Sequence, residues 1–247
     1  LFWSWANFDG VHYLGIAMKG YFAQFTQAFF PLYPMLIRQL DPLFHQPIIT
    51  GLVISHLSLI GFLWLFYKLL RLDMADKSAK STLIYLLLFP TAFFFGSLYT
   101  ESLFMFTVIA SFYAARKHHF FWAGLAGALA AATRVLGIVL IPALIIELLS
   151  FKRRRPIDWL YVLLPAAGLV LYMYYLNVAF HDPLYFINAQ PAFGASRSGE
   201  KLVLLYQVFW RYAKMLTSVP ITSLLYYTVS QEFLAGIVFL ILSVIAF

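Results

Sequence analysis

The stretch "PIITGLVISHLSLIGFLWLFYKLL", residues 47–70, decides the fold class. It carries no Asp, Glu, Lys or Arg before Lys68, and about 20 apolar residues are enough to cross a bilayer as a helix. Of the 247 residues, 63% are hydrophobic and 11% are charged. A soluble domain carries about 25% charged residues. These values predict an all-α, polytopic transmembrane helical protein, built as one membrane domain over residues 1–247.

The positive charge is clustered along the chain. Ten of the seventeen Lys and Arg residues fall within 68–80, 116–119 and 152–155. Because Lys and Arg gather in cytoplasmic loops, we expect all three clusters in the cytoplasm. We therefore attribute the net charge of +7 to the orientation of the chain in the membrane. The sequence has no basic stripe with stacking aromatics of the kind that would indicate a nucleic-acid partner.

This orientation fixes the remaining crossings. Residues 47–70 run inward, so residues 1–45 form an extracytoplasmic loop containing short interfacial helices. Residues 82–98 run outward with a kink at Pro90, and residues 102–116 return. Residues 158–178 run outward to a second extracytoplasmic segment, 179–231, and the apolar run 233–247 heads inward. Because the chain starts at Leu1 without Met and ends inside the apolar run "IVFLILSVIAF", we expect a further helix before Leu1 and more chain after Phe247.

Residues 120–150 do not fit a simple crossing. As one helix they would be about 46 Å long and would place two basic clusters on opposite sides. As two arms, each covers only about 22 Å. We favour two short arms that meet near "TRVLG", Thr133 to Gly137, with Arg134 at membrane depth near the outer face. An intramembrane arginine usually faces a partner or a water-filled cavity, although an ordinary loop arginine is the alternative.

The first loop carries the most unusual polar stretch, "WANFDGVHYLGIAMKGY", Trp5 to Tyr21. Asp9 is either the N-cap of a short interfacial helix or a general base for an acceptor hydroxyl. His12, three residues on, lies on the same helical face and either binds a phosphate or hydroxyl or anchors the helix. Lys19 is expected to extend its ammonium to the membrane surface. The later "AFFPLYPMLIR", Ala28 to Arg38, has two prolines that predict an ordered turn.

Other charges are expected at the same outer face. Glu101 either caps the following helix, pairs with Arg134 or contacts substrate. Arg197 and Lys201 either hold an anionic head group or are merely solvated. Together these residues predict an outer cavity that contains both acids and cations.

Several classes of site have no support in the sequence. The chain has no cysteine, no metal-binding pattern and no phosphate-binding glycine loop. "GLAGALAAATR" offers small residues for close helix packing rather than a nucleotide site. We therefore expect no cofactor or metal, and an enzyme at the outer face with no nucleotide motif would need an activated donor that is itself in the membrane.

The motifs resemble those of a known family. "FDGVHYLGIAMKGY" followed by "AFFPLYPMLIR" is similar to the first extracytoplasmic loop of the PIG-V-type GPI mannosyltransferases and their bacterial homologues, within the GT-C glycosyltransferases. "SLYTESLF", "AAATRVLG" and "HDPLYFINAQPAFG" follow in the expected order. Two positions depart from the family pattern: Asn7-Phe8 stands where Arg-Trp is common, and Phe193 where Trp is usual.

The resemblance implies a membrane glycosyltransferase, most simply a mannosyltransferase. It implies transfer from a polyprenyl-phosphate sugar to a glycan or glycolipid acceptor, with inversion, at the extracytoplasmic face. Asp9 matches the family's presumed base, and Arg134 is the first candidate for phosphate recognition. The substrate-binding candidates are His12, Glu101, Arg134, Gln190 and Arg197.

Two further expectations complete the interpretation. The alternative function is a non-catalytic transporter or flippase of a lipid-linked sugar, which would use the same cavity for binding. The chain is expected to be a multi-pass protein of a bacterial or archaeal plasma membrane rather than of the endoplasmic reticulum, with the lipid bilayer and its lipid-linked substrates as partners.

Overall fold

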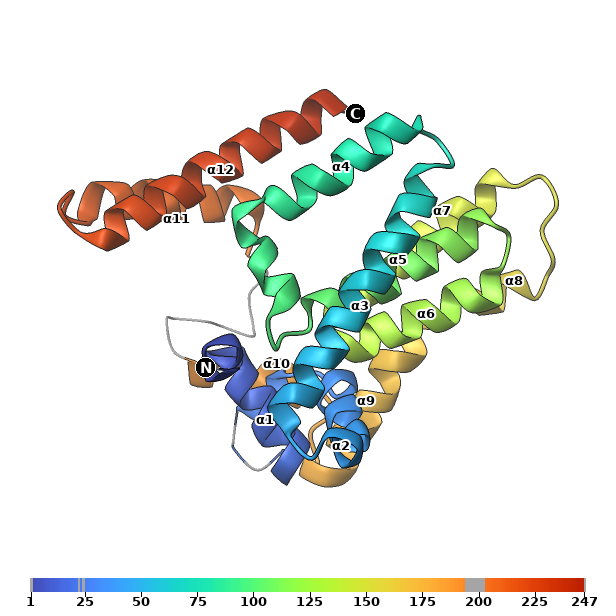
Figure 1. The fold of residues 1–247 in the computed structure, drawn as a ribbon, viewed down its shortest axis with the longest axis horizontal. Helices are drawn as coiled ribbons and strands as arrows, with labels where there is room; N and C mark the ends of the chain where they lie inside the picture. Colours follow the sequence, from blue (N-terminus) through green and yellow to red (C-terminus); the bar gives the residue numbers. More distant parts are fainter. Residues whose placement is uncertain (1, 22, 24, 194–202, 247) are drawn as a thin grey trace. The chain divides into compact units, whose positions relative to one another are not determined.

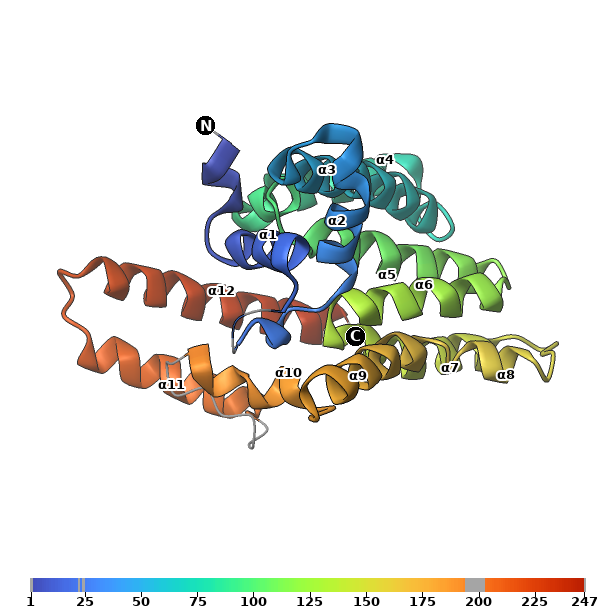
Figure 2. The ribbon, with the colours of Figure 1, turned by 90° about the horizontal axis from the view of Figure 1, so that it is seen from below.

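The computed structural model describes residues 2–21, 23, 25–193 and 203–246. Every regular element in these ranges is a helix, as expected for an all-α membrane protein. The contacts divide the chain into two units, residues 1–199 and 200–247. Figures 1 and 2 label the helices, and each unit is described by itself.

The first unit contains most of the helices. The α-helices are α1 (Asp9–Lys19), α2 (Leu32–Phe44), α3 (Pro47–Leu70), α4 (Asp76–Leu88), α5 (Glu101–Arg116), α6 (Phe120–Thr133), α7 (Leu140–Ser150), α8 (Asp158–Tyr161), α9 (Pro165–Phe180) and α10 (Tyr185–Asn188). The 3-10 helices are η1 (Phe2–Ala6), η2 (Thr26–Ala28), η3 (Pro90–Gly96), η4 (Val135–Val139) and η5 (Gln190–Phe193). The second unit contains α11 (Leu205–Ser218) and α12 (Leu224–Ala246).

Among the described residues, α3 and Leu224–Ile245 of α12 are long and apolar enough to cross a membrane. Helices α4 and η3 are together long and apolar enough for a third crossing, but they are bent by 88° at the break between them, so they would form a broken span. The predicted interruption at Pro90 is confirmed and is sharper than a kink. Pro90 lacks an N–H donor, and the residue before a proline avoids the helical conformation; Phe89 is extended accordingly.

Residues 120–150 form two arms, as predicted. Helix α6 ends at Thr133, η4 reverses the chain, and α7 returns to Ser150. A Cβ atom on Gly137 would lie 2.2 Å from the backbone nitrogen of Ala131, so only glycine permits so tight a turn.

The helices of the first unit pack side by side. Helix α5 packs between α3 and α6, and α6 also packs against α9 (Figures 1 and 2). Glycines allow this close approach: a Cβ atom on Gly168 would lie 2.0 Å from the carbonyl oxygen of Ala128, and one on Gly124 would lie 2.0 Å from that of Tyr161. The predicted role of "GLAGALAAATR" in helix packing is confirmed.

Two expectations about helix boundaries are wrong. The span expected over 158–178 is divided into α8 and α9, because Pro165 cannot donate a helical hydrogen bond. The prolines of "AFFPLYPMLIR" begin a helix rather than replace one. Pro31 precedes α2 and Pro34 lies in its first turn, where backbone N–H groups have no helical partner anyway.

The second unit also differs from expectation at one boundary. Helix α12 begins at Leu224, before the expected start at residue 233. Polar residues lie inside it because they have partners: the hydroxyl of Tyr212 on α11 donates a 2.7 Å hydrogen bond to Glu232, and Ser230 donates one to the carbonyl of Tyr226. This pairing also fastens the two helices of the unit to each other.

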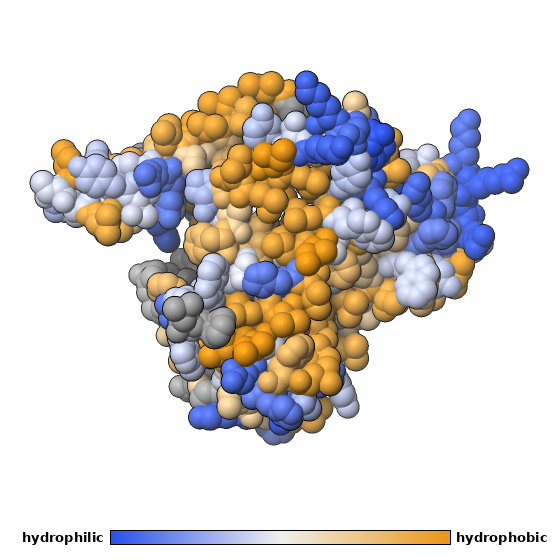
Figure 3. All heavy atoms as spheres, in the orientation of Figure 1, coloured by the Kyte–Doolittle hydropathy of each residue, from blue (hydrophilic) through white to orange (hydrophobic). Residues whose placement is uncertain are grey.

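The basic clusters gather at one end of the first unit. Arg116, the last residue of α5, donates two hydrogen bonds to Asp73 beyond α3 and lies 3.4 Å from Glu147 near the end of α7. Figure 3 shows hydrophobic atoms over the middle of this unit and hydrophilic atoms beside the loop between α7 and α8. Helix α5 runs from Glu101 to Arg116, so Glu101 lies at the opposite end.

Candidate active site

The site is built around Arg134, which lies between α6 and η4. Its backbone is extended, with φ −151° and ψ 143°, and its carbonyl accepts a 2.9 Å hydrogen bond from the N–H of Gly137. The turn thereby carries the Arg134 side chain out of the α6 helix and toward the start of α5.

Two residues at the start of α5 hold the guanidinium. Glu101 forms an ion pair with Arg134, and Nε of Arg134 donates a 2.8 Å hydrogen bond to Oγ1 of Thr100. The side chains of Arg134 and Glu101 are only 34% and 28% exposed. Partial burial strengthens such a pair relative to a solvated one, so the orientation of Arg134 is fixed before any ligand binds. The pairing proposed as one alternative for Glu101 is confirmed.

Tyr13 extends this network into α1. Its hydroxyl lies 3.3 Å from Oγ1 of Thr100, which is fully buried. Burial raises the pKa of Tyr13 to about 12, although the hydrogen bond with Thr100 acts in the opposite direction. Tyr13 is therefore a neutral hydroxyl at neutral pH.

Asp9 is the first residue of α1 and is exposed. The alternative that it caps the helix is wrong: Phe8 occupies the N-cap position, and no side chain there bonds to the helix backbone. Within the described residues, the carboxylate of Asp9 has neither an ion pair nor a hydrogen bond. Two long-range bonds place it: Leu98 donates to the carbonyl of Trp5 at 2.9 Å, and Tyr99 donates to that of Asn7 at 2.7 Å.

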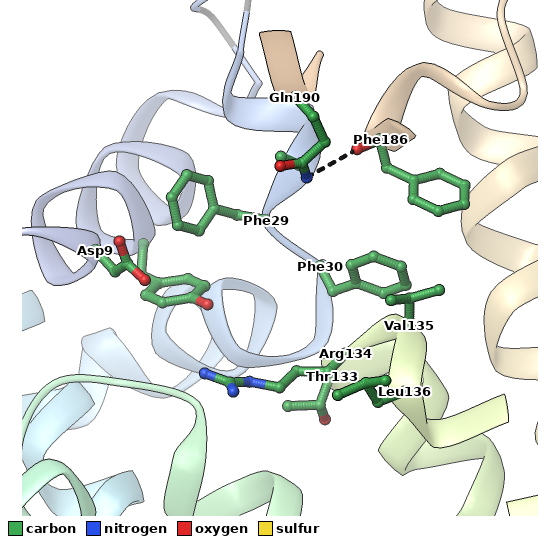
Figure 4. A pocket seen from close by; sticks show the side chains of 11 residues that line it. Asp9, Phe29, Phe30, Thr133, Arg134, Val135, Leu136, Phe186 and Gln190 are labelled. Carbon is green, nitrogen blue, oxygen red and sulfur yellow. Dashed lines mark hydrogen bonds between the residues drawn. The ribbon is translucent and has the colours of Figure 1, made fainter. Parts of the chain in front are cut away.

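Asp9 and Arg134 line the same cavity of about 350 Å³. Its other polar side chains are Tyr13, Thr133 and Gln190, and its aromatic walls are Phe29, Phe30 and Phe186. Figure 4 shows Asp9, Arg134 and Gln190 around this space, each from a different part of the chain. The amide of Gln190 donates a 3.3 Å hydrogen bond to the carbonyl of Phe186, and its oxygen has no hydrogen bond within the part of the chain that the structure describes.

The aromatic wall is held by tyrosine hydroxyls. Tyr172 on α9 donates a 2.6 Å hydrogen bond to the carbonyl of Gln27, and Tyr21 donates a 2.8 Å bond to that of Phe29. Phe30 packs in turn against Tyr172 and Phe186. The segment that carries Phe29 and Phe30 is thus fixed to α9 although it contains no long helix.

The structure treats the predicted site residues differently. Asp9, Arg134 and Gln190 line the same cavity, and Glu101 is paired with Arg134 without lining the cavity itself. His12 does not line the cavity; its ring stacks on Phe29 at 4.9 Å and meets Phe25 edge-on at 5.3 Å. Arg197 and Lys201 lie outside the described residues.

The sequence interpretation missed Tyr13, Thr100 and the aromatic wall. Tyr13 stands four residues after Asp9 on a helix, and this spacing alone indicates that the two share a face. Thr100 gives no such signal, because its role depends on contacts between residues far apart in the chain. Among the described residues, no group of three or more His, Asp or Glu side chains is placed to hold a metal ion.

An acceptor for a proton and a preorganised cation therefore face one partly open cavity, an arrangement suited to transfer of a group onto a hydroxyl with an anionic leaving group. A family model described as Mannosyltransferase (PIG-V) matches residues 1–154. The chain belongs to the PIG-V mannosyltransferase family. The matched residues include Asp9, Thr100, Glu101 and Arg134. No curated protein matches, and no solved structure matches. Membership makes this chain an integral membrane protein of a mannosyltransferase family.

Proposed function

We propose that the chain is a GT-C-type enzyme that transfers mannose from a polyprenyl-phosphate donor to a hydroxyl of a glycan or glycolipid, with inversion, at the extracytoplasmic face. The observation that carries this proposal is the shared cavity of Asp9 and Arg134. One group is an acid with no partner among the described residues, and the other is a cation whose position is fixed by Glu101 and Thr100.

Asp9 acts as the general base. The acceptor oxygen attacks the anomeric carbon on the face opposite the phosphate, and its proton passes to the carboxylate of Asp9. The bond between the anomeric carbon and the phosphate oxygen breaks, so the configuration inverts. Exposure and the lack of a partner within the described residues leave this carboxylate accessible to an acceptor.

Arg134 stabilises the leaving group. As the bond breaks, the electron pair passes to the phosphate oxygen, and polyprenyl phosphate departs with added negative charge. A guanidinium that is already oriented stabilises this charge without reorganising, which is how preorganised donors lower a barrier. Glu101 is thus a positioning residue in our proposal, and its contact with substrate is indirect.

Gln190 and His12 complete the proposal. Gln190 lines the cavity, and its amide oxygen suits a sugar hydroxyl. His12 supports the wall residue Phe29, so its effect on substrate is exerted through that wall. Arg197 remains a proposed ligand of an anionic head group. The enzyme needs no metal or organic cofactor in this scheme.

The proposed orientation rests on charge. The basic clusters lie at the Arg116 end of the first unit, and the cavity lies at the Glu101 end. Because Lys and Arg favour the cytoplasmic side, the cavity is assigned to the extracytoplasmic face of a bacterial or archaeal plasma membrane.

The test is transfer from a polyprenyl-phosphate mannose in vesicles that contain the purified full chain. We expect Asp9→Asn to fold normally but to lose transfer by at least about 100-fold, because general-base catalysis contributes ~10²–10⁴-fold. Asp41→Asn is the matched control, since Asp41 belongs to α2 and lies outside the cavity. Normal turnover by Asp9→Asn would exclude Asp9 as the base, and movement of the donor without transfer would favour a transporter.

A further inference from the structure

A second cavity, of about 490 Å³, adjoins the proposed active site. Neighbouring residues separate the two spaces. Phe30 lines the first cavity and Pro31 the second; Thr133 lines the first and Ala132 the second. The second cavity lies among α1, α2, α6 and α9, all within the first unit.

The second cavity opens through apolar side chains. Met35, Leu171 and Tyr175 line it and are 51%, 68% and 43% exposed. In a membrane protein such exposed apolar groups meet hydrocarbon rather than water. Its volume falls within the range of roughly 300–1,000 Å³ that is usual for small-molecule sites. Both features suit a hydrocarbon chain that enters from the side.

A single cation, Arg38, accompanies this apolar lining. It is exposed on α2 and has neither an ion pair nor a hydrogen bond within the described residues. Asp41, one turn further on, instead accepts a 3.2 Å hydrogen bond from Thr50. A guanidinium presents a planar set of donors that matches a phosphate group. Arg38 is therefore suited to bind the phosphate of a lipid head group at the edge of this cavity.

We propose that this cavity binds one hydrocarbon chain of an anionic glycerophospholipid whose phosphate is held by Arg38. The occupant is a second lipid, distinct from the sugar donor; this distinction alone rests on the proposed function, which assigns the donor's phosphate to Arg134 in the other cavity. Tyr21 and Tyr172 line the second cavity and bond to the segment that carries Phe29 and Phe30. The bound lipid therefore supports a wall of the active site.

The experiment measures binding directly. The purified full chain, freed of lipid in detergent, is titrated with palmitoyl-oleoyl phosphatidylglycerol and analysed by native mass spectrometry. We expect Arg38→Gln to weaken binding of the first lipid about tenfold, because a hydrogen bond to a charged group is lost. Leu171→Trp fills the mouth and is expected to weaken it as well. The matched controls are Arg153→Gln, an exposed arginine at the basic end, and Tyr174→Trp on the same helix but outside the cavity.

Each result decides the proposal. The proposal is supported if phosphatidylglycerol binds more weakly to Arg38→Gln and Leu171→Trp but not to either control variant. Unchanged binding in Arg38→Gln overturns it even if Leu171→Trp fails to fold, and equal weakening by Arg153→Gln shows nonspecific attraction instead. A long-chain polyprenyl phosphate is tested in parallel. If it displaces phosphatidylglycerol and its own binding depends on Arg38, the cavity holds the donor rather than a second lipid. Loss of transfer in Asp9→Asn is independent of all these outcomes.

Discussion

At the residue scale, the site depends on how little freedom Arg134 has. Glu101 supplies the opposite charge, and Thr100 accepts a hydrogen bond from Nε while its own hydroxyl lies beside Tyr13. One arginine is thus tied to α5 and, through Thr100, to α1. The geometry of the cavity accordingly depends on a threonine that does not line it.

Removing that hydroxyl gives a sharp prediction. Thr100→Val keeps the shape of the side chain but leaves Nε of Arg134 and the Tyr13 hydroxyl without their partner. We expect kcat/KM for transfer to fall about 10- to 100-fold, the usual cost of losing a hydrogen bond to a charged group. The measurement is steady-state transfer from polyprenyl-phosphate mannose in vesicles.

The control for Thr100→Val is Thr107→Val. Thr107 is also buried on α5, but its hydroxyl bonds only to carbonyls of its own helix. Equal losses in the two variants would mean that Thr100 affects activity through helix stability and not through Arg134.

The sequence allowed part of this site to be predicted. Asp9 and Arg134 were recognisable because a charge within an apolar chain needs a reason to be there. The pairing of Glu101 with Arg134 was one of three alternatives that the sequence left open, and the structure selects it. Thr100 and the fixing of Phe29 by Tyr21 could not be predicted, because uncharged residues carry no comparable signal and their contacts join distant segments.

At the element scale, close helix packing explains which small residues are required. Gly168 on α9 lies against the backbone of α6, where a Cβ atom would approach the carbonyl oxygen of Ala128 to 2.0 Å. Since backbone cannot move aside as a flexible side chain can, the two helices must separate to accept any larger residue.

We therefore expect Gly168→Ala to reduce the free energy of unfolding by about 1–3 kcal/mol, the cost of overpacking a tight interface. The check is the Tm of the variant in mild detergent. Gly96→Ala is the control, because its Cβ atom would meet neighbours only at 3.8 Å and 3.9 Å. A Tm for Gly168→Ala equal to that of the control would contradict the packing described here.

The opposite end of the same helices is joined by charge. Arg116 donates two hydrogen bonds to Asp73. This hydrogen bonding lowers the pKa of Asp73 below its ordinary value of 3.8. A carboxyl group whose pKa is lower in the folded state stabilises the fold above its unfolded pKa. That contribution is lost as the pH falls through the folded value.

Arg116→Lys should consequently cause a small fall in Tm at neutral pH, because lysine cannot reproduce the paired hydrogen bonds. The difference from wild type should shrink as the pH falls below the ordinary pKa of 3.8 and through the lowered pKa of Asp73 in the folded wild type, where this carboxyl group takes up a proton. A series of melting curves against pH measures it. A difference that stayed constant across this range would assign the effect to packing rather than to the ion pair.

The elements that could be predicted are those whose signal is local. An uninterrupted apolar run defined α3, and the short lengths of the two arms defined α6 and α7. The break between α8 and α9 depends on Pro165, and the start of α12 depends on the contact of Glu232 with Tyr212. Helix α11 was missed although Leu205, Val208, Tyr212 and Leu216 recur with helical spacing.

At the scale of the whole molecule, the first unit is polarised along α5. One end of this helix carries the pair of Glu101 with Arg134, and the other carries the pair of Arg116 with Asp73. Acids and cations meet at a cavity at the first end, whereas the second gathers basic clusters. The orientation of the chain in the membrane is inferred from charge alone, so it can be tested without an activity assay.

The absence of cysteine makes that test clean, because a single introduced cysteine is the only thiol in the chain. Gln46 is an exposed residue just before α3, and Ser78 is an exposed residue in the first turn of α4, which follows α3. In right-side-out vesicles we expect a membrane-impermeant maleimide to label Gln46→Cys and to leave Ser78→Cys unlabelled until detergent is added. The cluster of lysines near Ser78 should hold that end inside, since moving cationic side chains through hydrocarbon costs about 2.5–3.5 kcal/mol each. The reverse labelling pattern would place Asp9 and Arg134 in the cytoplasm, where a soluble nucleotide sugar becomes the plausible donor and the proposed chemistry loses its lipid-linked substrate.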